Sequence, residues 1–161
     1  MLDPGTTAPE FTLLGDDGPV SLDELTDGRP ALLAFFKTTC GTCKLAFPVY
    51  GELALRHGSA VNMVAVSQDD LASSHEFLEQ YGWHASVIED ASSGYATSAA
   101  YELPAVPTLY LIDADGVIRH ATSAWDRAAA NELDEVLCAI SGATPSPVST
   151  DDDARPDFKP G

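Results

Sequence analysis

The sequence contains little cysteine, and this scarcity excludes one class of protein. Three cysteines stand in 161 residues, whereas a secreted scaffold held together by disulfides would need more. A chain of this length buries about two thirds of the surface that its unfolded form exposes, so it does not depend on disulfides for stability. The cysteines that are present therefore need another explanation.

Positive charge is also scarce. There are 8 Lys and Arg residues against 25 Asp and Glu residues, and the formal net charge is -17. Binding to nucleic acids or to anionic membranes is driven by clustered Lys and Arg. We therefore expect no nucleic-acid partner and interpret the charge as that of a soluble, self-repelling surface. An acidic surface that attracts a basic partner is the alternative.

Long apolar runs are absent as well. No segment approaches the about 20 apolar residues that a membrane span requires, and the opening MLDPGTTAPEF has neither the basic region nor the apolar core of a signal peptide. As written, the chain is expected to be cytoplasmic, or extracytoplasmic if a signal peptide has been removed. We expect a monomer without a membrane span.

Apolar runs alternate with helical patterns over residues 1–140, which predicts one α/β domain with a central sheet. The expected strands lie at 11–14, 31–37, 61–67, 86–88, 107–113 and 117–122. From residue 141 the chain reads SGATPSPVSTDDDARPDFKPG, which is rich in proline and aspartate and has few apolar residues. This composition predicts a disordered, acidic, proline-rich tail over residues 141–161.

Two of the three cysteines lie in the stretch TTCGTCK at 38–44, directly after the apolar run ALLAFF. Cys40 thus follows a buried strand and precedes a helix, where free backbone N–H groups and the helix dipole favour a thiolate. Cys43 lies one turn further along, and this spacing lets its thiol attack a mixed disulfide formed at Cys40. The pattern is typical of a redox-active dithiol.

A metal site is an alternative interpretation of the same pair. Zinc would need two further soft ligands at a fixed spacing. There is no second CxxC, and Cys138 and the four separate histidines form no ligand motif. An incidental pair is the remaining alternative. We favour redox chemistry and expect neither a metal nor an organic cofactor.

Two motifs resemble the thioredoxin superfamily. The stretch FFKTTCGTCK at 35–44, with Pro48 five residues after Cys43, resembles the active-site strand, the CxxC and the kinked helix. The stretch YELPAVPT at 101–108, followed by LYLIDADGVI, resembles the loop with the cis-proline and the next hairpin. The opening APEFTLLGDDGPVSLDEL and the long segment before Pro107 are closer to TlpA-type thiol-disulfide oxidoreductases and to the related alkyl hydroperoxide reductase/thiol-specific antioxidant family.

The resemblance implies an α/β thioredoxin fold, in which helices flank a central mixed sheet, with an N-terminal extension and a helix-strand insertion before the cis-proline. It implies that Cys40 is the nucleophile and Cys43 the resolving thiol. The implied substrate-binding residues are Thr39, Gly41, Thr42, Val106 and Pro107. The Val106 backbone would pair with an extended substrate segment. The implied partners are protein dithiol or disulfide substrates and a dithiol electron donor.

The sequence also departs from the family pattern. Thr39 stands where Trp is usual, and Thr42 replaces the commonest Pro of the CxxC, which frees a backbone N–H that could stabilise the thiolate. Ala34 stands where thioredoxins carry a buried acid, and Ala46 where many TlpA-type members carry Glu. The usual proton acceptor is therefore missing, and we expect water or an unidentified group to take the proton from the resolving thiol.

Two other functions are compatible with this fold. A peroxiredoxin-like thiol peroxidase would typically carry Pro and Thr seven and three residues before its reactive cysteine. Before Cys40 those positions hold Leu33 and Lys37, and before Cys43 they hold Phe36 and Cys40, so the motif is absent. The second alternative is a non-catalytic thioredoxin-fold binding module whose cysteines serve regulation or metal capture.

The third cysteine lies in the last predicted helix. At about 100° per residue, Cys138 points away from the apolar stripe at 133–140 and towards Asn131 and Asp134. We expect a thiol outside the main core that takes no part in turnover. Nearby carboxylates should keep its pKa high.

Overall fold

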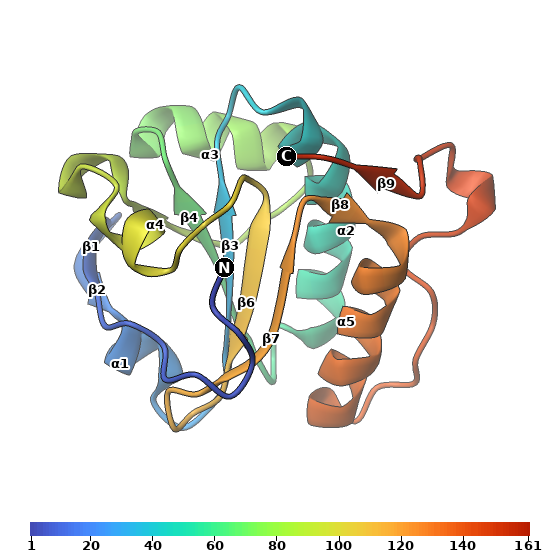
Figure 1. The fold of residues 1–161 in the computed structure, drawn as a ribbon, viewed down its shortest axis with the longest axis horizontal. Coiled ribbons are helices and arrows are strands. Elements are labelled where there is room, and N and C mark those ends of the chain that lie inside the picture. Colours follow the sequence, from blue (N-terminus) through green and yellow to red (C-terminus); the bar gives the residue numbers. More distant parts are fainter.

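The computed structural model describes residues 1–161 and has a central mixed β-sheet with helices on both faces (Figure 1). The strands are β1 (Thr12–Gly15), β2 (Gly18–Ser21), β3 (Ala31–Phe36), β4 (Asn62–Ser67), β5 (Ser86–Glu89), β6 (Thr108–Ile112), β7 (Ile118–Ser123), β8 (Trp125–Asp126) and β9 (Phe158–Lys159). The helices are α1 (Leu22–Thr26), α2 (Gly41–His57), α3 (Leu71–Gln80), α4 (Ala96–Ala100) and α5 (Arg127–Ser141), with 3-10 turns η1 (Ala91–Ser93) and η2 (Asp151–Asp153). None of these helices is long and apolar enough to cross a membrane.

Seven strands form the main sheet in the order β2-β1-β5-β4-β3-β6-β7. The pairs β3–β4 and β4–β5 are parallel, and the other pairs are antiparallel. This mixed sheet with helices on both faces confirms the expected thioredoxin fold. β1, β2 and α1 form its N-terminal extension, and α3, β5 and α4 lie between β4 and β6, in the place of the expected insertion.

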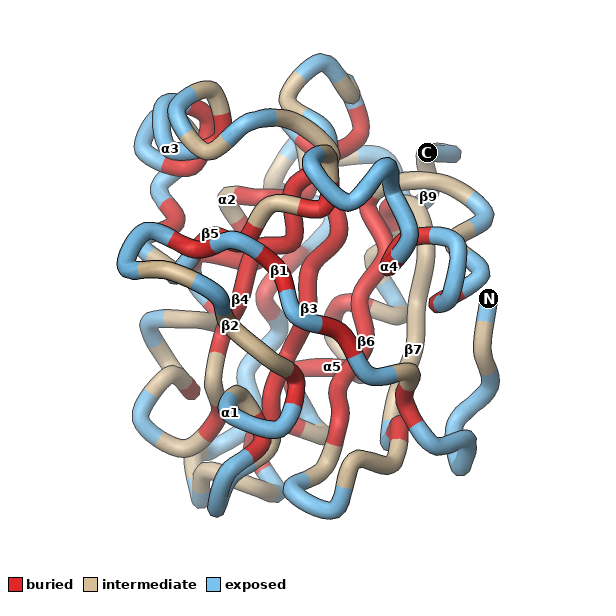
Figure 2. Tube along the Cα trace, turned by 90° about the vertical axis from the view of Figure 1, so that its left-hand side faces the viewer, coloured by how far each residue is buried: buried red, intermediate tan, exposed pale blue.

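β3 lies in the interior of the sheet, between β4 and β6, where its six apolar residues can be buried on both faces. All six are buried (Figure 2). Leu32 and Ala34 belong to the apolar cluster that includes residues of α2, α3 and α5, whereas Leu33 and Phe35 belong to the cluster that includes residues of α1. The strand therefore separates two cores and leads to the edge of the sheet where α2 begins.

Two short elements near the N-terminus, β2 and α1, were not predicted from the sequence. β2 begins at Gly18, whose φ of 125° is a conformation that residues with a side chain rarely adopt. α1 begins with a capping box, in which Ser21 Oγ accepts from the Glu24 N–H and the Glu24 carboxylate accepts from the Ser21 N–H. A five-residue helix is too short for its apolar periodicity to be recognised.

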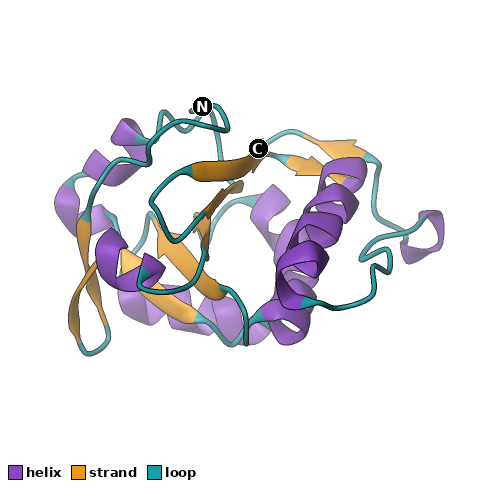
Figure 3. Cartoon of the chain, turned by 90° about the horizontal axis from the view of Figure 1, so that it is seen from below, coloured by secondary structure: helices purple, strands orange, loops and turns teal.

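The tail lies against the domain, which differs from the disorder that its composition predicts (Figures 1 and 3). β9 pairs antiparallel with β8. Val148 is buried and belongs to the cluster that includes residues of α2 and α5. Composition averages over the whole segment, whereas docking depends on a few residues that find partners on the domain. The division of the chain at residues 140 and 141 stays a prediction.

Candidate active site

Cys40 is the residue that begins α2. Its backbone is extended, with φ -73° and ψ 117°, and its Sγ accepts a hydrogen bond from the backbone N–H of Cys43 at 3.2 Å. The sulfur thus takes the place of the side-chain oxygen that usually caps a helix. The first N–H groups of a helix have no partner within the helix, and the Cys40 sulfur supplies an acceptor for one of them.

The sulfur of Cys43 lies in different surroundings. Cys43 is fully buried in the apolar cluster that includes Ala34, Ala46 and Leu109, whereas Cys40 is half-buried at its edge. Burial raises the pKa of the Cys43 thiol well above its ordinary value, and the neighbouring Cys40 sulfur raises it further. The pair therefore combines one accessible sulfur with one that stays protonated.

The loop before β6 brings a backbone carbonyl to the same sulfur. The Val106–Pro107 peptide bond is cis, as the resemblance implies. The Cys40 thiol donates to the Val106 carbonyl oxygen at 3.3 Å. The two segments meet because β3 and β6 are adjacent in the sheet, with Phe35 opposite Thr108.

The structure gathers every predicted site residue around Cys40. Thr39 and Gly41 are exposed at the start of α2, and Thr42 is buried. Val106 is half-buried and Pro107 is buried. Their roles in binding stay predictions.

An aspartate that sequence analysis did not single out holds the segment before Cys40. One oxygen of Asp69, Oδ2, accepts from the Thr38 N–H at 2.7 Å and from the Thr38 hydroxyl at 2.8 Å. The Asp69 N–H in turn donates to Ser67 Oγ at 3.0 Å. The signal was available, because β3 and β4 are parallel and polar residues after their carboxyl ends meet at one edge of the sheet.

Tyr50 is a second residue near the sulfurs that sequence analysis missed. It is buried in α2, two turns after Cys43. Burial, followed by the charges of Cys43 and Cys40, raises the pKa of its phenol well above the ordinary value. Tyr50 is therefore protonated and cannot replace the acid that is missing at Ala34 and Ala46, whose side chains are both fully buried.

Residues of the tail contact the same site. Lys159 Nζ donates to the Gly41 carbonyl at 3.2 Å, and Thr42 Oγ1 donates to the Pro160 carbonyl at 2.6 Å. The main chain of Gly161 lies so close to Val106 that a Cβ built on the glycine would be 2.5 Å from the Val106 oxygen.

Cys138 lies far from the dithiol. It belongs to neither apolar cluster, as expected, but it is buried. Burial, followed by the Asp134 carboxylate at 3.7 Å, raises the pKa of its thiol. Asp134 also bonds His57 at the last residue of α2, about 20 Å along the helix from Cys43 at 1.5 Å per residue. Its absence from turnover stays a prediction.

The tertiary structure groups His57, Asp134 and Cys138, which no sequence motif connects. Their potential ligand atoms all lie within 4.8 Å of one another, and all three residues are buried. However, Asp134 Oδ1 already lies 2.8 Å from Arg56 Nη1 and 3.0 Å from His57 Nε2, and its Oδ2 accepts from the Ser146 N–H. The carboxylate is thus satisfied within the protein, and the cluster joins the ends of α2 and α5.

Comparisons with known proteins agree with this architecture. Residues 4–121 match the AhpC/TSA family. Thiol-disulfide oxidoreductase YkuV of Bacillus subtilis is 30% identical over 116 residues, which cover 65% of this chain and 73% of that protein. Thiol-disulfide oxidoreductase ResA of the same organism is 30% identical over 118 residues, which cover 71% of this chain and 64% of that protein.

A solved structure shows the same arrangement. It is a protein from Chlorobium tepidum assigned as a candidate thiol:disulfide interchange protein DsbE. The TM-score is 0.76 at 28% sequence identity, and the superposition covers 88% of this chain and 100% of that chain. The shared fold therefore extends well beyond the CxxC segment.

Proposed function

The chain belongs to the AhpC/TSA family and is a thioredoxin-like oxidoreductase of the TlpA type, and we propose that it exchanges electrons with protein disulfides through the CGTC dithiol. The observation that carries this proposal is the contrast between the two sulfurs. Cys40 is half-buried and its Sγ accepts from the Cys43 N–H at 3.2 Å, whereas Cys43 is fully buried. The two sulfurs thus suit the roles of attacking and resolving thiol.

The proposed reaction proceeds in two exchanges. The Cys40 thiolate attacks one sulfur of the substrate disulfide, so that a mixed disulfide forms and the other substrate sulfur leaves as a thiolate. Cys43 then loses its proton and attacks Cys40 Sγ, which releases the second substrate sulfur. The substrate disulfide is reduced by two electrons, and the Cys40–Cys43 dithiol is oxidised to a disulfide. Another dithiol protein restores the dithiol by the reverse steps.

Burial holds Cys43 protonated until the mixed disulfide has formed, which favours attack in the correct order. No carboxylate occupies the positions of Ala34 and Ala46, and Tyr50 is itself protonated. We therefore assign the proton of Cys43 to water or to the departing substrate thiolate.

The substrate surface follows from the groups that surround Cys40. The Val106 carbonyl points at the sulfur and is a main-chain acceptor for an extended substrate segment. Neither Gly41 nor Thr39 carries a large side chain that would itself block the approach to the sulfur. Such a surface binds main chain more than side chains, which suits an enzyme with several protein substrates.

The first test is the redox equilibrium of the pair. The protein is poised in glutathione or dithiothreitol buffers, alkylated and weighed as an intact protein. We expect one reversible two-electron transition, which Cys40→Ser and Cys43→Ser each abolish, while Cys138→Ser leaves it unchanged. Cys43→Ser should also accumulate a mixed disulfide with an oxidised protein substrate. The absence of a transition, or full cellular function of the double Cys40→Ser, Cys43→Ser variant, would instead support the binding module.

The peroxidase alternative finds less support. Leu33, which occupies one position of the peroxiredoxin motif, is fully buried in the core, and Lys37 at the other is exposed. Neither residue presents a hydroxyl that could orient a peroxide. The predicted cytoplasmic location and monomeric state remain predictions.

A further inference from the structure

The segment 157–161 covers the surface on which the proposed function places the substrate. Its Pro160 carbonyl accepts from Thr42 Oγ1 at 2.6 Å, and Lys159 Nζ donates to the Gly41 carbonyl at 3.2 Å. Gly161 packs directly on the Val106 carbonyl, to which the Cys40 thiol also donates. Figure 1 shows this end of the chain beside the start of α2. The three contacts border Cys40 from both sides.

The segment also has the conformation expected of a bound substrate. It is extended, and as β9 it pairs antiparallel with β8, with Lys159 opposite Trp125 and Phe158 opposite Asp126. The pairing continues where the Arg127 N–H donates to the Asp157 carbonyl at 2.9 Å. β8 and β9 form a two-stranded sheet separate from the main sheet, and their main-chain pairing is of the kind by which extended peptides bind to a strand.

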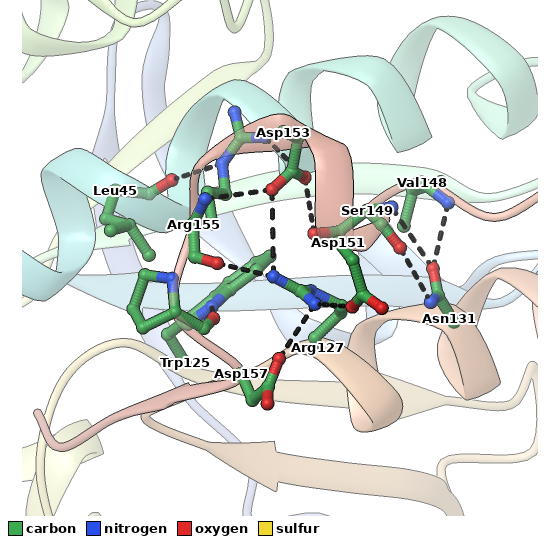
Figure 4. A network of polar contacts seen from close by, with 11 residues as sticks. Leu45, Trp125, Arg127, Asn131, Val148, Ser149, Asp151, Asp153, Arg155 and Asp157 are labelled. Carbon is green, nitrogen blue, oxygen red and sulfur yellow. Dashed lines mark hydrogen bonds and ion pairs between the residues drawn. The ribbon is translucent and has the colours of Figure 1, made fainter.

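Arg127 is the centre of the contacts that hold the segment in place (Figure 4). Its Nη1 pairs with Asp157 at 2.7 Å and also with Asp151, and its Nη2 donates to the Arg155 carbonyl. Trp125 adds a hydrogen bond from its indole N–H to the Pro156 carbonyl, and the Arg155 guanidinium lies 6.0 Å from the Trp125 ring centre.

These contacts differ in strength along the tail. Val148 and Ser149, which precede the segment 157–161, are buried and anchor the beginning of the tail. The side chains of Asp151 and Asp157 are 95% and 88% exposed, so their ion pairs with Arg127 are weak and are screened by salt. The end of the tail is therefore a tethered occupant that can leave the site while its beginning stays attached.

We propose that residues 157–161 act as an intramolecular competitor that occupies the substrate surface of the dithiol, and that a protein substrate must displace them. This inference rests on the proposed function. The occupant also indicates the class of substrate, which is an extended segment that pairs with β8 and approaches Val106 with a small residue. Large disulfide proteins need this surface, whereas a small disulfide can reach Cys40 without it.

The test compares the full chain with a variant that lacks residues 157–161 and with Arg127→Gln. Arg119→Gln is the matched control, because Arg119 forms an exposed ion pair with Asp113 at 2.7 Å away from the tail. Three rates are measured. The first is the reaction of Cys40 with a polymer-linked maleimide, followed by peptide mass mapping. The other two are the reduction of the disulfides of insulin and the reduction of a small aromatic disulfide.

We expect the deletion to raise the maleimide rate and to lower KM for insulin, each by about threefold to tenfold, the size of a few exposed contacts. Arg127→Gln should act in the same direction but more weakly, and kcat and the rate with the small disulfide should change little. Added salt should lower KM for insulin in the full chain but not in the deletion variant. Arg119→Gln should match the parent throughout.

Unchanged maleimide rate and KM in the deletion variant would overturn the competitor role, and so would a higher KM, which would make the tail part of the binding surface. The maleimide rate reports on coverage of Cys40 even if no disulfide is reduced, so failure of the proposed function is distinguished from failure of this inference. If the deletion variant does not fold, the salt dependence of KM for insulin tests the competitor role instead. A KM that falls with salt in the full chain, and falls less in Arg127→Gln, supports it, and a KM that salt does not lower in the full chain overturns it.

Discussion

At the scale of single residues, the two sulfurs of the CGTC motif differ in burial. The first turn of a helix places one residue at the exposed helix end and another, three positions later, against the core. Cys40 receives the N–H of Cys43 at the exposed end, whereas Cys43 points into the apolar cluster. Neighbouring charged side chains are not needed for this difference. It follows from the position of the motif between a buried strand and a helix.

This difference predicts an alkaline limit to the stability of the reduced protein. The folded-state pKa of Cys43 is raised above the ordinary value of 9.0, so its contribution is complete below pH 9 and is lost as the pH rises further. The free energy of unfolding should fall by up to about 1.4 kcal/mol per pH unit. Urea titrations of the reduced protein and of Cys43→Ser between pH 7 and about pH 10 measure this fall, since the unfolding free energy decreases linearly with urea concentration. Equal pH dependence in the two proteins would contradict the assignment.

A second residue-scale prediction concerns Asp69, which positions the segment before Cys40. Asp69→Ala leaves the Thr38 N–H and hydroxyl without their acceptor, so we expect a loss of about 1–3 kcal/mol in unfolding free energy. The altered segment should also shift the redox potential of the dithiol. Asp69→Asn keeps one carbonyl oxygen and should restore most of both quantities. If Asp69→Ala lowered the free energy of unfolding but left the redox potential of the dithiol unchanged, Asp69 would have a structural role only.

At the scale of elements, α2 is held against the turn that follows α3 by a contact that only glycine allows. A Cβ on Gly51 would lie 2.6 Å from the Gly82 carbonyl oxygen. α2 also contains Pro48 in its interior, where the helix loses one backbone hydrogen bond. The position of α2, and thus of Cys40 at its start, depends on this packing.

We therefore expect Gly51→Ala to destabilise the protein by about 1–3 kcal/mol through the forced shift of packed backbone. This sign is opposite to that of helix propensity, which favours alanine over glycine by up to about 1 kcal/mol. Leu55→Ala is the control on the same helix, because Leu55 is 81% exposed and should change stability little. Urea denaturation of both variants measures the effect, and a stabilised Gly51→Ala would show that the turn can move away.

At the scale of the whole molecule, the net charge of -17 acts against compactness. Raising the ionic strength from about 0.01 M to about 0.15 M shortens the Debye length from about 30 Å to about 8 Å. We expect the free energy of unfolding to rise over this range, by on the order of 1 kcal/mol. Thermal or urea unfolding in NaCl, with sucrose as an uncharged control, measures it. A fall in stability with salt would mean that favourable ion pairs outweigh the repulsion.

The same salt should loosen the end of the tail, whose attachment depends on Arg127 and exposed carboxylates. Salt thus acts in opposite directions on the domain and on the occupant of its site. If salt stabilises the domain but loosens the tail, the two parts respond independently, as expected for an ordered domain with a displaceable tail.

Much of the fold was predictable because its signals are local. The apolar run of β3 and the alternation of apolar runs with helical patterns depend on neighbouring residues. The strand expected at 11–14 corresponds to β1, whereas β2 and α1 were missed because they are too short for periodicity. Asp69 and Tyr50 were missed because their importance depends on which strand or sulfur lies beside them.

The sequence by itself determined the alternating architecture, the cysteine pair at the start of a helix and the loop that ends in Pro107, because each depends on contiguous residues. Only the tertiary structure decided that the tail contacts the residues beside that pair and that His57 lies beside Asp134 and Cys138. Those contacts join residues far apart in the chain, 77 positions for His57 and Asp134 and 118 for Thr42 and Pro160. Composition and periodicity carry no information on such pairs, since these depend on the path of the whole chain.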